Sequence, residues 1–196
     1  MTTLLLVRHG ETDWNRDERF QGQADPPLNQ TGRSQAVDLS ALLAADPLSA
    51  VYTSPLQRAF ETAEIIAAAH GLEPSTVEAL REMYDGSWEG LTRAEVEERF
   101  PHEYARWLEH RRGPGDGESY DGLCGRVVPA ILEIAAAHPN GRVLAVTHAG
   151  PIRATLAHAD GISYEEARKR GPAIENGSLV ELAIEDGDLR RFEEDE

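Results

Sequence analysis

The sequence predicts a single-domain α/β fold: a three-layer sandwich with a mostly parallel central sheet, helices on both faces, and a helical cap over the carboxyl ends of the strands. Two short aliphatic runs, Leu4–Val7 and Val143–Val146, are the main evidence. Because neither run alternates with polar residues, each is typical of a strand buried on both faces, as in a parallel sheet covered by helices. The length of 196 residues fits one domain spanning 1–196.

The first aliphatic run is followed by a long irregular segment, 11–31, and then by a helix. Glycine, proline and asparagine interrupt any periodicity in this segment, and loops of such length inside a domain are usually functional or disordered. From Arg33 onward, apolar residues at helical spacing predict a helix that ends before Pro47. Its expected buried stripe comprises Ala36, Leu39, Leu42 and Leu43.

A second unit of strand and helix begins at Ala50. The run Ala50–Thr53 predicts a short strand, and Ser54-Pro55 predicts the start of a helix. Ser54 has the residue type of an N-cap, and proline is favoured at the first helical position. The stripe of this helix comprises Leu56, Phe60, Ala63 and Ile66 or Ala67.

The segment 84–138 predicts the helical cap. Thr92 and Glu95 form a capping box at the start of one helix, which Pro101 interrupts. The glycine-rich stretch 113–117 follows a helix rather than a strand, so we interpret it as a linker and not as a phosphate-binding loop. A further helix runs from about Tyr120 to Ala137.

The last part of the chain repeats the opening arrangement and then closes the sheet. The run Val143–Val146 predicts a strand, and His148 lies just beyond its carboxyl end. Pro151 marks the start of the helix that follows. The segments 179–184 and 189–192 are joined by a short acidic turn, and we expect them to form a hairpin.

Composition excludes several classes of partner. The net charge of −16 argues against nucleic acid and anionic membranes, since both are bound through basic patches. No apolar run approaches the ~20 residues of a transmembrane helix, and the first residues lack the pattern of a secretion signal. These two observations predict a cytoplasmic protein, and the single cysteine, Cys124, which cannot form an internal disulfide, agrees with a reducing compartment. The sequence leaves the oligomeric state of the protein open between a monomer and a homodimer.

Basic and titratable residues gather where the aliphatic runs end. Arg8 and His9 follow the first run, and His148 follows the second. Because ligands bind at the carboxyl ends of strands in open α/β sheets, we expect both histidines to face one crevice. Arg58 lies in the first turn of a predicted helix, where a cation opposes the helix dipole. A bound phosphate is one compensating anion, and a surface ion pair with Glu61 is the alternative.

These motifs resemble those of the histidine phosphatase superfamily, which includes cofactor-dependent phosphoglycerate mutases and many small phosphatases. The first motif is Arg8-His9-Gly10-Glu11-Thr12 with Trp14-Asn15, and Phe20-Gln21-Gly22 is similar to the loop that folds over the phosphate in the family. The second motif is Ser54-Pro55-Leu56-Gln57-Arg58-Ala59. The phrase Trp88-Glu89-Gly90-Leu91 is similar to one that recurs in the phosphatase branch.

The resemblance implies a phosphomonoesterase that hydrolyses small phosphorylated metabolites through a phosphohistidine on His9. Glu82 aligns with the proton donor, while Ala149 stands where the acid phosphatase branch carries a donor aspartate. The implied catalytic residues are His9, Glu82, Arg8, Arg58 and His148. The implied substrate-binding residues are Arg8, Asn15, Gln21, Gly22, Arg58, His148 and Ala149.

Two other functions stay open on the sequence. A cofactor-dependent phosphoglycerate mutase shares the phosphohistidine chemistry but returns the phosphoryl group to the substrate, and a non-catalytic phospholigand-binding module would only bind it. The cap is rich in acidic residues, which favours the phosphatase over the mutase. The histidines show no spacing typical of metal ligands, so we expect neither a metal nor another cofactor.

Overall fold

A mixed six-stranded sheet, with strand order β3-β2-β4-β1-β5-β6, runs through the centre of the molecule. The structure is a computed structural model that describes residues 1–110 and 114–192. The strands β1 (Thr2–Arg8), β4 (Arg142–Thr147), β2 (Leu48–Thr53) and β3 (Ser75–Thr76) pair in parallel. The hairpin of β5 (Leu179–Glu185) and β6 (Asp188–Arg191) adds antiparallel to β1. The predicted α/β class and mostly parallel sheet are confirmed.

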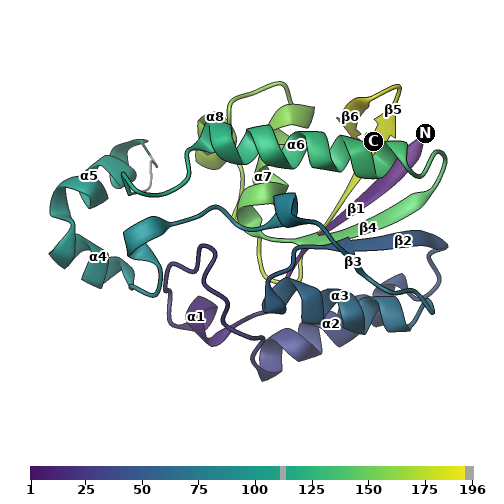
Figure 1. The fold of residues 1–196 in the computed structure, drawn as a ribbon, viewed down its shortest axis with the longest axis horizontal. Coiled ribbons are helices and arrows are strands. Elements are labelled where there is room, and N and C mark those ends of the chain that lie inside the picture. The colour runs from purple at the N-terminus through teal and green to yellow at the C-terminus, as the bar shows by residue number, and fades with distance from the viewer. Residues whose placement is uncertain (111–113, 193–196) are drawn as a thin grey trace.

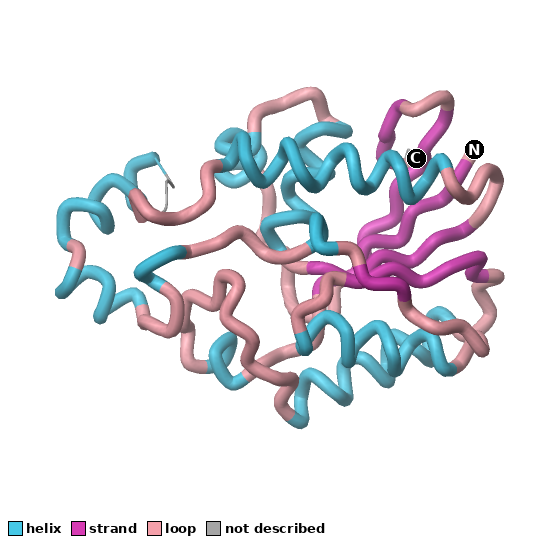
Figure 2. The backbone as a smooth tube through the Cα atoms, viewed as in Figure 1, coloured by secondary structure: helices cyan, strands magenta, loops and turns pink. Residues whose placement is uncertain are grey.

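Helices cover both faces of this sheet and also extend beyond the carboxyl ends of its parallel strands (Figure 1). In chain order they are α1 (Asp13–Arg16), α2 (Gln30–Leu43), α3 (Gln57–Ala68), α4 (Arg93–Arg99), α5 (Pro101–His110), α6 (Tyr120–Ala136), α7 (Ala149–Ala159) and α8 (Tyr164–Arg170). Two single turns of 3₁₀ helix, η1 (Glu78–Leu80) and η2 (Gly86–Trp88), lie between β3 and α4. Figure 2 shows α2 and α3 on one face of the sheet and α6 and α7 on the other.

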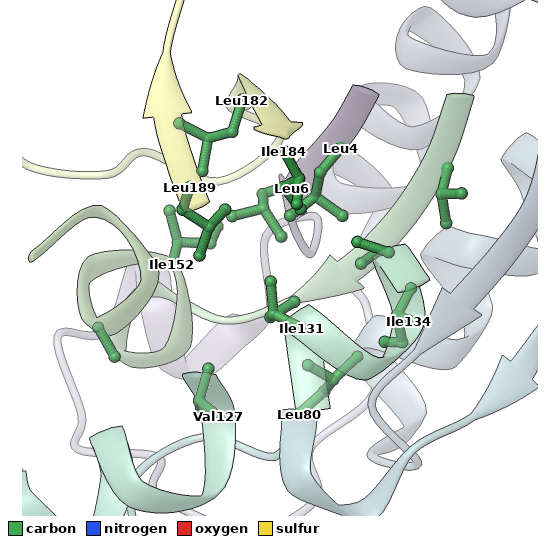
Figure 3. Close-up of a cluster of buried hydrophobic side chains, with 14 of the residues drawn as sticks. Leu4, Leu6, Leu80, Val127, Ile131, Ile134, Ile152, Leu182, Ile184 and Leu189 are labelled. Carbon is green, nitrogen blue, oxygen red and sulfur yellow. The ribbon is translucent and has the colours of Figure 1, made fainter. Parts of the chain in front are cut away.

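Each face of the sheet carries its own apolar core, as the continuous aliphatic runs predict. Along β1 the side chains alternate: Leu4 and Leu6 pack toward α6 and α7, whereas Leu5 and Val7 pack toward α2 and α3. Figure 3 shows the first of these cores, which includes Ile131 of α6. Because both faces are covered, strand β1 is buried from Leu4 to Val7.

The predicted cap segment 84–138 divides into two parts, and only the first of them lies beyond the sheet. The helices α4 and α5 extend away from the sheet on the side of the strand carboxyl ends (Figure 1). They enclose a small aromatic core of Trp88, Val96 and Trp107. Helix α6, in contrast, packs its buried side chains against the sheet and belongs to a sheet-covering layer. The capping box of Thr92 and Glu95 and the break at Pro101 are confirmed.

Two predicted helix starts were wrong. Helix α2 begins at Gln30, three residues before Arg33, because the side chain of Asn29 caps it. Helix α3 begins at Gln57 and has no side-chain cap, so Ser54 is not its N-cap residue. The backbone N–H of Ser54 donates to the carbonyl of Val146 (3.0 Å), directly after the end of β2.

One predicted core residue is also on the surface. Leu42 of α2 is 68% exposed, whereas its neighbour Leu43 is 2% exposed. The helix turns by about 100° per residue, so only one of two consecutive leucines can face the sheet.

Among the helices in the two described ranges, none combines the length and the apolar character needed to cross a bilayer.

Candidate active site

The pairing of β1 with β4 brings the two strand-end histidines together. Arg8 is in register with Thr147, so the next residues, His9 and His148, leave the same sheet edge side by side. Their ring centroids are 5.0 Å apart and the rings meet edge to face at 62°. Both residues are buried, His9 at 3% exposure and His148 at 0%. The two histidines therefore lie side by side at one sheet edge, as expected, but only His9 lines the pocket there.

One ring nitrogen of His9, Nδ1, is used in a hydrogen bond, and the other, Nε2, is left for chemistry. Its Nδ1 lies 2.7 Å from the carbonyl oxygen of Gly10, an acceptor, so Nδ1 carries the proton and donates. The lone pair is then on Nε2. Burial lowers the pKa of His9 well below 6.5, and the nearby guanidiniums of Arg58 and Arg8 lower it further. The ring is therefore neutral, as a nucleophile must be.

Arg8 and Arg58 supply positive charge close to His9 in the same pocket. Arg8 donates through Nη1 to the carbonyl of Ile174 (2.5 Å), and Arg58 donates to the carbonyls of Ala24 (2.6 Å) and Gly22 (2.8 Å). Arg58 is fully buried, and burial lowers its pKa to about 10, so it is still a cation. The Nε atoms of both arginines are buried without a partner among the described residues.

The alternative of a surface ion pair for Arg58 is wrong. Glu61 instead pairs with Arg33 of α2, whose Nε lies 2.5 Å from the glutamate oxygen. Arg58 is a fully buried cation, and the Nε–H groups of both arginines are buried and unused, which is costly without an anion. The arrangement therefore fits a bound oxyanion.

His148 is fixed by Ser54, the residue that follows β2. The imidazole Nε2 and the serine hydroxyl are 2.8 Å apart, while Nδ1 of His148 is buried without a partner among the described residues. Burial and the charge of Arg58 lower the pKa of His148 well below its usual value. The role of Ser54 is thus to orient His148 rather than to cap α3.

Glu82 reaches the same site from the segment between η1 and η2. Its carboxylate accepts from the backbone N–H of Gly150 (3.1 Å) at the amino end of α7 and from that of Met83 (2.8 Å). A Cβ on Gly150 would lie 2.2 Å from Oε1 of Glu82, so a residue without a side chain is needed for this approach. Glu82 lines the same pocket as His9.

The four remaining predicted site residues also line that pocket. Asn15 accepts through Oδ1 from the backbone N–H of Thr12 (3.1 Å), in the capping box of α1. Gln21 accepts from the Thr12 hydroxyl (3.1 Å), and Gly22 holds Arg58 through its carbonyl. Ala149 is the first residue of α7. All the predicted site residues therefore converge, although His148 lies behind the pocket wall rather than in it.

Sequence reasoning missed two residues that hold the site together. Asn176 donates to the carbonyl of His9 (3.0 Å) from the turn before β5. Arg126 of α6 donates to the carbonyls of Arg81 (2.8 Å) and Glu82 (2.9 Å), next to the pocket. The sequence pattern could have indicated Arg126, because it is a cation between two residues of the buried helix stripe, Leu123 and Val127. Asn176 had none.

Comparisons with known proteins agree with this geometry. The model of the histidine phosphatase superfamily, branch 1, matches residues 4–193. Phosphoglycerate mutase-like protein 4 of Arabidopsis thaliana is 39% identical over 193 residues, which cover 94% of this chain and 80% of that protein. Phosphoserine phosphatase 1 of Hydrogenobacter thermophilus is 38% identical over 168 residues, covering 85% of this chain and 80% of that one.

A solved structure, YhfR of Bacillus stearothermophilus, superposes with a TM-score of 0.90 at 33% identity and covers 96% of this chain and 94% of that one. The family model includes the strand ends that carry His9 and His148, and both sequence relatives cover most of the chain. This chain therefore belongs to the histidine phosphatase superfamily.

Proposed function

We propose that this protein is a phosphomonoesterase that hydrolyses small phosphate esters through a phosphohistidine on His9. The observation that carries the proposal is the buried, neutral His9 ring, with Nδ1 held by Gly10 and flanked by the cations of Arg8 and Arg58. A nucleophile that is neutral and fixed in orientation, inside a cationic pocket, suits attack on a phosphate ester. The phosphatase relatives and the family membership support the same reaction class.

In the first step, Nε2 of His9 attacks phosphorus and the bond between phosphorus and the ester oxygen breaks. Charge on the transferred phosphoryl group spreads over three oxygens, so its stabilisation depends on positioned cations and donors. The unused Nε–H groups of Arg8 and Arg58 are suited to this purpose. Glu82, as a carboxylic acid, gives its proton to the departing alkoxide.

In the second step, a water molecule attacks the phosphohistidine. Glu82, now a carboxylate, takes a proton from that water, and the bond between phosphorus and Nε2 breaks. Inorganic phosphate leaves, and Glu82 and His9 return to their starting states. The hydrogen bond from Gly150 fixes the carboxyl group at the amino end of α7, where it can serve both steps.

The test is to trap the phosphoryl-enzyme. Brief mixing with ³²P-labelled p-nitrophenyl phosphate, followed by alkaline denaturation, should leave acid-labile label on the wild-type protein. His9→Ala should carry no label and lose at least about 10³-fold in kcat, since the nucleophile is gone. His158→Ala, an exposed histidine of α7, is the matched control and should behave as the wild type.

Other outcomes separate the alternatives. Conversion of 3-phosphoglycerate to 2-phosphoglycerate faster than phosphate release would favour the mutase. Binding of phosphate esters without label or turnover would leave a binding module. A His9→Ala variant that keeps both label and turnover contradicts the assignment of the nucleophile.

A further inference from the structure

The active-site pocket contains a carboxyl group that the proposed reaction does not use. Asp85, the residue directly before η2, lines the pocket together with His9, Arg58 and Glu82. A carboxylate at this place is unexpected, because negative charges repel one another strongly where solvent is partly excluded. Asp85 therefore has to be reconciled with a pocket that binds an oxyanion.

Gly22 connects Asp85 to the phosphoryl end of the pocket. The carbonyl of Gly22 accepts from Nη2 of Arg58 (2.8 Å), and its backbone N–H donates to the carboxylate of Asp85. Gly22 has a φ of +50°, and a Cβ on it would lie only 2.8 Å from the backbone nitrogen of Asp85, so a glycine is needed for this approach. One residue thus lies between the Asp85 carboxylate and a buried cation of the oxyanion site.

The surroundings of Asp85 shift its pKa toward neutral pH. Burial, and then the charges of Glu82 and Glu89, raise the pKa of Asp85 to about 7, while Arg168 of α8 and the N–H of Gly22 favour the ionised form. The carboxyl group therefore changes its charge close to neutral pH.

Further charged and titratable groups surround Asp85 from α6, the linker before it and the pocket wall. The phenol of Tyr120 on α6 lies within range of the Asp85 charge. Asp116 and Glu118 accept from the backbone N–H groups of residues 87 and 84, on either side of Asp85. The other charged side chains that line the pocket are all arginines: Arg8, Arg19, Arg58, Arg93 and Arg153. The pocket wall is therefore mostly basic, and an ionised Asp85 reduces its attraction for an anion.

The other groups with shifted pKa values near the pocket keep one charge state around neutral pH. Burial lowers the pKa of His9 and that of His148 well below 6.5, so both rings are neutral. Burial also lowers the pKa of Arg58 to about 10 and raises that of Tyr120 to about 12. Among these groups, only Asp85 responds to a change of pH around 7.

We propose that Asp85 is protonated whenever a dianionic oxyanion is bound, so that anion binding above neutral pH takes up one proton at this carboxyl group. The proton comes from the solvent and joins a carboxylate oxygen of Asp85, and the pocket then faces the anion with one negative charge fewer. Asp85 thereby sets the pH range in which the pocket accepts a phosphate ester. This inference rests on the oxyanion site of the proposed function but not on hydrolysis.

The direction of the pH effect follows from the two charge states of Asp85. In the free protein Asp85 is protonated below about pH 7, and there the anion binds without taking up a proton. The negative charge of the bound anion raises the pKa of Asp85 further, so the affinity falls as pH rises above about 7. The loss is at most about tenfold per pH unit, because a single proton is involved.

Isothermal titration calorimetry with tungstate tests the coupling. Tungstate is a tetrahedral dianion that does not titrate near neutral pH, so any proton uptake comes from the protein. Wild type should bind it at least about tenfold more weakly at about pH 8.5 than at about pH 7. In buffers of different ionisation enthalpy, wild type should take up close to one proton at about pH 8.5. Asp85→Asn should take up none, and its Kd should vary by less than about twofold over this range.

The control for this measurement is the exposed Asp38→Asn on α2, which should behave as wild type. Asparagine at position 85 keeps an acceptor for the N–H of Gly22, so Asp85→Asn removes the charge and leaves the contact. A variant that binds tungstate more weakly at every pH, with the wild-type slope, would give Asp85 a structural role only and overturn the proposal. Proton uptake that persists in Asp85→Asn would assign the proton to another group, such as Glu82 or a histidine, and would also overturn it.

A second variant and a turnover assay complete the test. Glu82→Gln removes a charge that raises the pKa of Asp85, so the fall in tungstate affinity should begin at a lower pH than in wild type. An unchanged onset would contradict the assignment of the proton to Asp85. If wild type binds no tungstate, the inference fails together with the oxyanion site. If binding and proton uptake are as expected but p-nitrophenyl phosphate is not hydrolysed, only the proposed function has failed.

Discussion

Burial favours the neutral form of two residues in the pocket, with opposite effects on their pKa values. For His9 burial disfavours the imidazolium, so its pKa falls well below 6.5. For Asp85 burial disfavours the carboxylate, so its pKa rises to about 7. The two shifts have different consequences near neutral pH, because His9 stays neutral there whereas Asp85 titrates.

The raised pKa of Asp85 gives the fold a stability that depends on pH. The ordinary aspartate pKa is 3.8 and the folded value is about 7, so the native state binds the extra proton between these values. Stability contributed by this site is therefore lost as pH rises from 4 to 7. Above about pH 7 an ionised Asp85 costs on the order of a few kcal/mol.

We expect Asp85→Asn to unfold with a higher free energy than wild type at about pH 8, since the amide avoids the buried charge. The advantage should shrink by at most ~1.4 kcal/mol per pH unit toward pH 5. Urea unfolding of both proteins across this range measures it. The exposed Asp38→Asn is the control, and a difference between Asp85→Asn and wild type that stays constant with pH would contradict the assigned titration.

At the scale of elements, helix α6 supports the loop that carries Glu82. Arg126 donates to the carbonyls of Ala79 (2.7 Å), Arg81 (2.8 Å) and Glu82 (2.9 Å), and its side chain also pairs with Glu118 (2.7 Å). These carbonyls belong to η1 and the segment after it, which pairs with no strand of the sheet. The Arg126 guanidinium, together with side-chain donors from Gln23 and Thr147, therefore holds the carbonyls of this segment.

We expect Arg126→Met to act on catalysis through Glu82, as a positioning residue. Alkyl phosphates need a proton on the leaving oxygen, whereas p-nitrophenolate leaves without one. The variant should lose about 10-fold or more in kcat for an alkyl phosphate and much less for p-nitrophenyl phosphate.

Arg126→Lys tests the geometry of the same contact. A single ammonium cannot reach all three carbonyls, so rescue should be partial. The matched control is Arg142→Met, which removes an arginine of β4 that pairs with Asp46 and with Glu181 of β5. Equal losses for the two esters in Arg126→Met would indicate a general loss of folded protein and not a displaced proton donor.

At the scale of the whole molecule, an acidic protein contains a locally basic cleft. The net charge is −16, yet Arg8 and Arg58 are held within the pocket beside His9. Long-range repulsion of anions is screened beyond about 10 Å at 0.1 M salt, so the close cations dominate at the binding site. An oxyanion that binds at these cations only in the folded protein is expected to stabilise the native state.

We expect inorganic phosphate or orthovanadate to raise the Tm. At about 100 times Kd the stabilisation is about 2.7 kcal/mol. For a chain of this size that corresponds to a rise of roughly 5–10 °C. Differential scanning fluorimetry is the measurement, with potassium chloride at equal ionic strength as the control for screening of the net charge. Arg58→Met should lose the specific rise, and a rise equal to that in chloride would contradict the oxyanion site.

The sequence by itself determined the parts that depend on local pattern. The aliphatic runs of β1 and β4 specify buried strands, and each run is followed directly by its histidine, so the pairing of His9 with His148 follows once the strands are adjacent. The capping box of Thr92 and Glu95 also spans only four consecutive residues. The strand pattern and the capping box depend on residues close together in the chain, whereas the adjacency of β1 and β4 does not.

Only the tertiary structure decided which distant groups complete the site. Asn176 contacts His9 across 167 positions of the chain, and Ser54 contacts His148 across 94. The segment predicted as a uniform cap divides between α4–α5 and the sheet-packed α6, because burial depends on what each helix faces. Likewise, Asp85 and Arg168 come from segments far apart in the chain and share a pocket only after folding, which no local periodicity records.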